Sequence, residues 1–283
     1  MKITSHQLEA FFETAKLRSF SKAANALAVT QSALSQRISH LEKDLEVALF
    51  IRDPSGPLLT SAGELLLRHC MVTSSLEDEV LGQLKSSHAQ LRGQIRIAGF
   101  SSILRSVVIP SLAPFLRDHP QVHCEFRSYE VAELFQVLRN GEADFVILDY
   151  HLQKAGIAEH VLGQEEYIVI QSTKYKGAED IYLDHGPQDN ATESFFREQS
   201  NAPKSYRRSF MGDVYGILNG VELGLGRAIM SKHLLGTSSK VEIVKGYKKY
   251  QRDVVLSYYE QPYYSRLHKE LVLQLTKKAK EYL

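Results

Sequence analysis

The sequence predicts an α+β protein with a small helical domain, a long connecting helix and a two-lobed α/β domain. Three observations predict it. Two short helical patterns joined by a tight connection lie within residues 20–45, a narrow apolar stripe follows from residue 61, and strand and helix patterns alternate from residue 93. We therefore expect domains at residues 1–60 and 93–283, with a linker at residues 61–92.

The helical patterns at residues 20–27 and 31–45 each have one apolar face with the spacing of an α-helix. These faces consist of Phe20, Ala23, Ala24 and Leu27 in the first, and of Leu34, Ile38, Leu41 and Leu45 in the second. Paired alanines allow the two helices to approach closely. Residues 4–16 have a similar face and predict a third helix of the same core.

The second pattern also places short hydrogen-bonding side chains away from its apolar stripe, near its start. Such side chains suit the major groove of double-stranded DNA. We expect base contacts from Gln31, Ser32, Ser35 and Gln36, with Arg37 on a guanine edge or a phosphate. An ordinary helical bundle is the alternative, but a bundle does not require this outward polar set. The pattern favours a helix-turn-helix.

We expect contacts with the sugar-phosphate backbone of the DNA from Ser21, Lys22, Thr30 and Arg52. Arg52 lies beside the turn at residues 53–57, between two short apolar strands that predict a β-wing. It could contact a phosphate or be a solvated surface arginine. The net charge of only +1 gives weak support for a nucleic-acid partner, so binding would need local focusing of cations in a dimer.

The linker begins with Ser61-Ala-Gly-Glu64, which has the form of a capping box, and predicts a helix to about His88. Its narrow apolar stripe consists of Leu65, Val72, Leu76, Val80 and Leu84. A helix of roughly 27 residues is about 40 Å long, too long for the small domain to cover. We expect it to pair with its copy in a homodimer. Packing within its own chain is the alternative.

The remaining residues alternate between strand and helix and predict a largely parallel sheet. We assign the first lobe to residues 93–164 and 260–283, and the second to residues 165–259. The chain would cross between the lobes near residues 150–165 and 252–260. This arrangement is of the periplasmic-binding-protein type.

Ligands of such domains bind at the carboxyl ends of the strands. Ser101 and Ser102 open a helix and could bind a carboxylate, or could act as a plain N-cap. Asp149 could receive an ammonium group or hold a loop amide. Phe210 and Met211 lie on the opposite wall, and Gly226 serves backbone packing or ligand approach.

The helix-turn-helix residues also carry a family resemblance. The segment from Phe20 to Leu45, with Leu49-Phe50-x-Arg52 and Leu59-Thr60-x-Ala62-Gly63, resembles LysR-type transcriptional regulators. Residues 221–230 are similar to that family's Gly-x-Gly strand, although Ser231 stands where a proline often follows. The resemblance implies a ligand-responsive regulator that binds promoter DNA as a homodimer or homotetramer. It looks closest to regulators that respond to arginine or lysine, although the effector stays unknown.

Other classes of protein have less support. The sequence has none of the common nucleophile-elbow, phosphate-loop or zinc-protease motifs, so we expect no enzyme, no cofactor and no metal site. Cys70 and Cys124 suit a reducing compartment. The absence of a signal core or long apolar run predicts a cytoplasmic protein without membrane contact. The alternative is a cytoplasmic binding protein for an amino-acid-like molecule, with N-terminal assembly helices.

Overall fold

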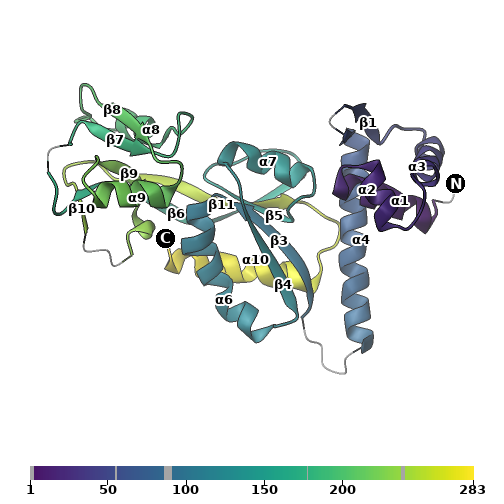
Figure 1. The fold of residues 1–283 in the computed structure, drawn as a ribbon. Coiled ribbons are helices and arrows are strands. Elements are labelled where there is room, and N and C mark those ends of the chain that lie inside the picture. Colours follow the sequence, from purple (N-terminus) through teal and green to yellow (C-terminus); the bar gives the residue numbers. More distant parts are fainter. Residues whose placement is uncertain (1–2, 55, 86–90, 177, 237–239) are drawn as a thin grey trace.

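The computed structural model describes residues 3–54, 56–85, 91–176, 178–236 and 240–283. Figure 1 shows the expected parts in a row: a helical domain at one end, the long helix α4 beside it, and an elongated α/β body beyond. The predicted fold class is confirmed. The exact domain boundaries stay a prediction.

The N-terminal domain is a three-helix core with a two-stranded wing. Its elements are α1 (Ser5–Leu17), α2 (Phe20–Ala26), α3 (Gln31–Leu45), β1 (Phe50–Asp53) and β2 (Gly56–Leu59). Phe11, Leu34 and Leu41 are fully buried, and Ala23 and Ala24 lie at the contact between helices. The predicted apolar faces therefore form the core of this domain.

Helix α4 (Ser61–Lys85) follows the wing directly. The predicted capping box is wrong, because Thr60 and not Ser61 precedes the first turn. The Thr60 hydroxyl accepts the backbone N–H of Gly63 at 3.0 Å. Glu64 instead forms an ion pair with Arg139 of the α/β body at 2.6 Å. The predicted end of the helix near His88 lies outside the described residues.

The apolar stripe of α4 divides into two parts. Leu65, Val80 and Leu84 are exposed by 64%, 54% and 77%. Val72 and Leu76 instead line a cavity between α4 and the first lobe. Both residues are half-buried, so part of each side chain faces its own lobe, and their pairing with a second chain stays a prediction. Spacing alone could not show that the chain's own lobe would cover them.

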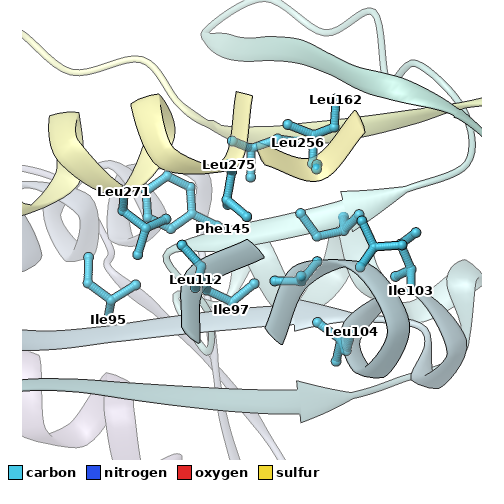
Figure 2. Packing of buried hydrophobic residues seen from close by; sticks show 14 of the residues in the cluster. Ile95, Ile97, Ile103, Leu104, Leu112, Phe145, Leu162, Leu256, Leu271 and Leu275 are labelled. Carbon is cyan, nitrogen blue, oxygen red and sulfur yellow. The ribbon is translucent and has the colours of Figure 1, made fainter. Parts of the chain in front are cut away.

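The first lobe is a three-layer α/β unit. It contains β3 (Gly93–Gly99), α5 (Ser101–Ile103), the π-helical turn η1 (Leu104–Val108), α6 (Ile109–Asp118), β4 (Val122–Ser128), α7 (Val131–Arg139), β5 (Phe145–Leu148), α10 (Arg266–Lys278) and the 3-10 turn η3 (Ala279–Glu281). Helices α6 and α10 lie on one face of the sheet and α7 on the other (Figure 1). Figure 2 shows how Leu112 and Leu271 pack with Phe145 between sheet and helices.

Two long strands connect the lobes. β6 (Ile157–Ser172) and β11 (Tyr250–Tyr259) are antiparallel, pairing from Ile157 with Tyr259 to Tyr167 with Tyr250. The two predicted crossings are these strands. β3 is parallel to β4 and β5, but β11, β9 and β10 pair antiparallel with their neighbours, so the sheet is mixed and not largely parallel.

The second lobe packs against the far half of β6. Its elements are β7 (Ile181–Asp184), α8 (Ala191–Arg197), β8 (Arg207–Phe210), α9 (Val214–Glu222), β9 (Ala228–Ser231), the 3-10 turn η2 (Lys232–Leu234) and β10 (Val241–Ile243). β7 and β8 form a separate parallel pair. At the end of β7, the buried Asp184 carboxylate accepts from the Thr192 hydroxyl at 2.5 Å and pairs with Arg208. Burial raises the pKa of this carboxyl.

His268 on α10 is buried among aromatic rings of the first lobe. Its ring lies 4.5 Å from that of Phe145 and 4.7 Å from that of Tyr258. Its Nε2 atom has no hydrogen-bond partner among the described residues. Burial therefore lowers the pKa of His268 to about 4, from an ordinary value of 6.5.

We expect this histidine to make the protein sensitive to acid. The unfolded chain binds the proton more readily, so stability falls as pH drops from 6.5 toward 4, by roughly 3 kcal/mol in full. His268→Phe keeps a ring in place and removes the proton site. The unfolding midpoint is measured at pH 7 and at pH 5. The difference between these two midpoints should be smaller in this variant than in the wild type. An equal change in both proteins would contradict the assignment.

The two cysteines lie in different parts of the fold. Cys70 belongs to the core of the N-terminal domain and Cys124 to β4, and both are free thiols. Burial raises the pKa of Cys70 to about 11 and that of Cys124 to about 12. Both thiols are thus protonated at neutral pH.

Two further searches cover the described part of the chain. None of its helices combines the length and apolar character needed to cross a membrane. Within the same ranges, no group of three or more histidine, cysteine, aspartate or glutamate side chains is arranged to hold a metal ion.

Candidate nucleic-acid interface and effector site

Helix α3 presents a polar face on the side opposite its buried stripe. Gln31, Ser32 and Gln36 are exposed, whereas Ser35 and Arg37 are half-buried. Leu34, Ile38 and Leu41 fix the helix in the core, so the polar side chains are held on a rigid element. The five residues predicted to contact bases therefore lie on one helix, with Arg37 at the edge of the packed side.

The exposed face extends further along α3 than the predicted set. Ser39 and His40 are also exposed and follow Gln36 around the helix. Their polar character was visible in the sequence, but their distance from the helix start gave no reason to assign them a base contact.

The residues predicted to hold the DNA backbone surround the start of α2 and α3. Ser21 and Lys22 are exposed in the first turn of α2. Thr30 is the N-cap of α3, where its hydroxyl accepts the backbone N–H of Ala33 at 3.1 Å and lies 3.0 Å from the Ser32 hydroxyl. Thr30 thus has a structural role in addition to any contact with DNA.

The wing lies next to the helices and is closely packed against them. Arg52 in β1 pairs in register with Pro57 in β2. Its side chain lies outside the described atoms, so its predicted phosphate contact stays a prediction. A Cβ atom on Gly56 would lie 2.8 Å from the backbone oxygen of Arg18, which shows how closely the wing approaches the end of α1.

The predicted effector residues of the first lobe lie at the start of α5. Phe100 is the N-cap of α5, and among the described residues no side-chain hydrogen bond caps this end. The predicted capping by Ser101 or Ser102 is therefore wrong. Ser101 is exposed, while Ser102 is buried and its carbonyl accepts the Ser106 hydroxyl at 2.5 Å. The backbone amides at this end keep their capacity to bind an anion.

Asp149, which directly follows β5, is not a free carboxylate between the two lobes. It pairs with Arg252 of β11 at 2.6 Å, and Arg252 also donates to Asn190 of the second lobe at 3.3 Å. Among the described residues, the partner of Asp149 is thus Arg252 and not the predicted loop amide, and the predicted contact with an ammonium group stays a prediction. Burial alone would lower the pKa of Arg252, but its hydrogen bonds and the nearby negative charge outweigh burial and raise it.

A second contact joins the lobes near the same place. Glu130, the N-cap of α7, lies 3.5 Å from His185, which follows β7. Arg252 and His185 were not predicted as site residues. Their partners are distant in the sequence, so no local pattern could have identified them.

The predicted effector residues of the second lobe differ in exposure. Phe210 is 47% exposed at the end of β8, with the Arg208 guanidinium 5.3 Å from its ring, and Met211 follows it. Gly226 is buried, and a Cβ atom there would lie 2.7 Å from the Ile181 backbone oxygen. Gly226 therefore serves close packing of the backbone, and the approach of a ligand to it stays a prediction.

These features define a DNA-binding regulator with an attached ligand-binding domain. Residues 5–64 match the family described as bacterial regulatory helix-turn-helix protein, lysR family, and residues 88–280 match the LysR substrate binding domain. The chain belongs to the LysR family of transcriptional regulators. The family expected from residues 20–63 is thus confirmed.

Several known proteins are similar over most of the chain. The HTH-type transcriptional regulator YofA of Bacillus subtilis is 26% identical over 234 residues, covering 81% of each protein. The crystal structure of ArgP from Mycobacterium tuberculosis has a TM-score of 0.80 at 22% identity, covering 98% of both chains. Full-length LysG of Corynebacterium glutamicum with bound effector Arg has a TM-score of 0.77 at 21% identity, again covering 98% of both. At such identities the structural matches show the fold alone.

Proposed function

We propose that this regulator binds promoter DNA as a symmetric oligomer, with one α3 helix in each of two successive major grooves. The observation that carries the proposal is the exposed polar face of α3 on a firmly packed domain. Gln31, Ser32, Ser35 and Gln36 contact base edges, and Arg37 contacts a guanine edge or a phosphate. Ser21, Lys22, Thr30 and Arg52 hold the backbone and set the register. The protein acts where the DNA is, in the cytoplasm.

The oligomer is built on α4. Leu65, Val80 and Leu84 supply an exposed apolar surface on a long helix, and such a surface supports pairing with a second copy. Val72 and Leu76 support the contact of α4 with its own first lobe. The oligomer is either a dimer or a tetramer.

We expect Leu84→Asp to weaken this oligomer. A charge at an apolar helix–helix contact is costly, so the mass measured by light scattering should fall toward that of one chain. Leu223→Asp is the matched control, because Leu223 is 66% exposed but lies on the second lobe. An unchanged mass for Leu84→Asp would contradict pairing through the C-terminal part of α4.

The effector is a small molecule with a carboxylate, and an amino acid is the first candidate. The amides at the start of α5 beside Ser101 suit a carboxylate, and the similar LysG structure contains bound Arg. Because Asp149 is paired with Arg252, an ammonium or guanidinium group would have to compete with that pair or bind elsewhere. Phe210 and Met211 provide apolar contact from the second lobe.

Thermal-shift screening tests the effector. Amino acids and aromatic carboxylates are added singly to the full-length protein. A true effector raises the melting temperature in proportion to RT ln(1 + [L]/Kd). An Arg252→Gln variant leaves Asp149 without its cation and should change the ranking of cationic against neutral amino acids. A panel without any shift would contradict this part of the proposal.

A further inference from the structure

The two lobes also meet at two successive residues of the π-helical turn η1. The Arg105 guanidinium lies 4.1 Å from the Tyr215 ring in the first turn of α9. The neighbouring Ser106 hydroxyl lies 2.7 Å from Nδ1 of His233 in η2. A π-helical turn is rare and often marks a functional site. Here it carries the first lobe's contacts to Tyr215 and His233.

His233 continues this contact to the connecting strand β6. Its Nε2 atom lies 2.7 Å from a carboxylate oxygen of Glu165. The side chains of His233 and Glu165 are 3% and 0% exposed, so the pair is shielded from water. Glu165 also accepts hydrogen bonds from Ser231 and, at 3.1 Å, from Tyr167. Each polar atom of the carboxylate is thus occupied.

The hydrogen bonds define where the protons lie. The Ser106 hydroxyl donates to the Ser102 carbonyl at 2.5 Å, because a carbonyl can only accept. Ser106 has one hydroxyl proton, so Nδ1 of His233 must donate to it. A continuous series of hydrogen bonds therefore links Glu165 to the His233 ring, the Nδ1 atom of His233 to the Ser106 hydroxyl, and this hydroxyl to the backbone carbonyl of Ser102.

This arrangement differs from the triad of a serine hydrolase. In a triad the histidine accepts the proton of the serine hydroxyl. Here the Ser106 hydroxyl instead donates its hydrogen bond to the Ser102 carbonyl, so His233 does not accept the proton and Ser106 is not activated as a nucleophile. Ser106, His233 and Glu165 instead connect η1 of the first lobe with η2 of the second lobe and with strand β6.

We propose that Glu165, His233 and Ser106 form a latch that fixes the angle between the lobes and transmits effector binding at Ser101 and Ser102. The proposal rests on the proposed function in assigning the effector to these serines. The latch ends on the carbonyl of Ser102 itself. A ligand that moves the first turn of α5 therefore changes the hydrogen bond of Ser106 and, through His233, the position of the second lobe.

Ser106→Ala tests the latch without burying an unpaired charge, because the Glu165–His233 pair remains. Ser111→Ala is the matched control. The Ser111 hydroxyl makes the same kind of bond within the helix, to the Val107 carbonyl at 2.6 Å, but no contact with the second lobe is found for it among the described residues. Amide hydrogen exchange of the ligand-free, full-length proteins is measured at residues 231–235.

We expect exchange at residues 231–235 to become about tenfold faster in Ser106→Ala, as the loss of one buried hydrogen bond predicts. Ser111→Ala should exchange there like the wild type. These residues are remote in sequence from Ser106, so a purely local change in the helix would not alter them. Unchanged exchange at residues 231–235 in Ser106→Ala would overturn the proposal.

A second measurement separates the latch from the effector assignment. L-Arginine is titrated into the wild type while operator affinity is followed. If L-arginine changes the affinity of the wild type, Ser106→Ala should lose that change, and a preserved response would overturn the latch. If L-arginine leaves the affinity of the wild type unchanged, the assignment of arginine as effector fails, and the exchange result alone decides the latch.

Discussion

Gln36→Ala and Arg37→Ala are each expected to weaken specific DNA binding by about tenfold or more. Each removes a side chain from the exposed or flanking face of α3, and a good base contact contributes roughly 1–3 kcal/mol of discrimination. Gln36 is exposed and Arg37 half-buried, so Gln36→Ala is the cleaner test of recognition. The measurement is fluorescence anisotropy with a duplex from upstream of the protein's own gene.

Gln121→Ala and Arg117→Ala are matched controls, because both residues are exposed on the first lobe. They should bind like the wild type. Circular dichroism checks that each variant keeps its helices. Wild-type affinity in both α3 variants, with folding intact, would contradict the assigned roles.

Gly63→Ala is expected to destabilise the N-terminal domain by roughly 2–4 kcal/mol. A Cβ atom at this position would lie 2.2 Å from the Leu49 backbone oxygen and 2.9 Å from the Leu59 side chain. The first obstacle is backbone, which cannot move aside without shifting the wing away from α4. Amide exchange should accelerate across residues 5–45, and DNA binding should be lost with it.

Gly186→Ala is the matched control, because nothing lies within 4 Å of a Cβ atom built there. This substitution should leave amide exchange unchanged both in the N-terminal domain and in the two lobes. Normal protection of residues 5–45 in Gly63→Ala would contradict the close contact between wing and α4.

Local patterns predicted much of this fold. The helical spacing of Leu34, Ile38 and Leu41 and the turn at residues 53–57 depend on neighbours in the sequence, and these neighbours decide helix and wing formation. The three-part organisation followed from the same kind of pattern. The base-contacting candidates were found because they share one short helix with the buried stripe.

Long-range partners could not be predicted in this way. Asp149 was predicted to meet a ligand or a loop amide, but Arg252 is its partner, 103 residues further along the chain. His233 lies in a short turn without periodicity, and its contacts with Ser106 and Glu165 arise only when the lobes are assembled. Similarly, spacing predicted the stripe on α4 but not the lobe that covers Val72 and Leu76.

Footprinting of the full-length protein on its upstream DNA tests the central claim most directly. We predict two protected half-sites on the same face of the duplex, with centres about 10–10.5 base pairs apart. Protection should disappear at both half-sites in Gln36→Ala. A single isolated footprint, or no protected site at low salt, would contradict the binding of two α3 helices, one from each of two chains, to successive major grooves.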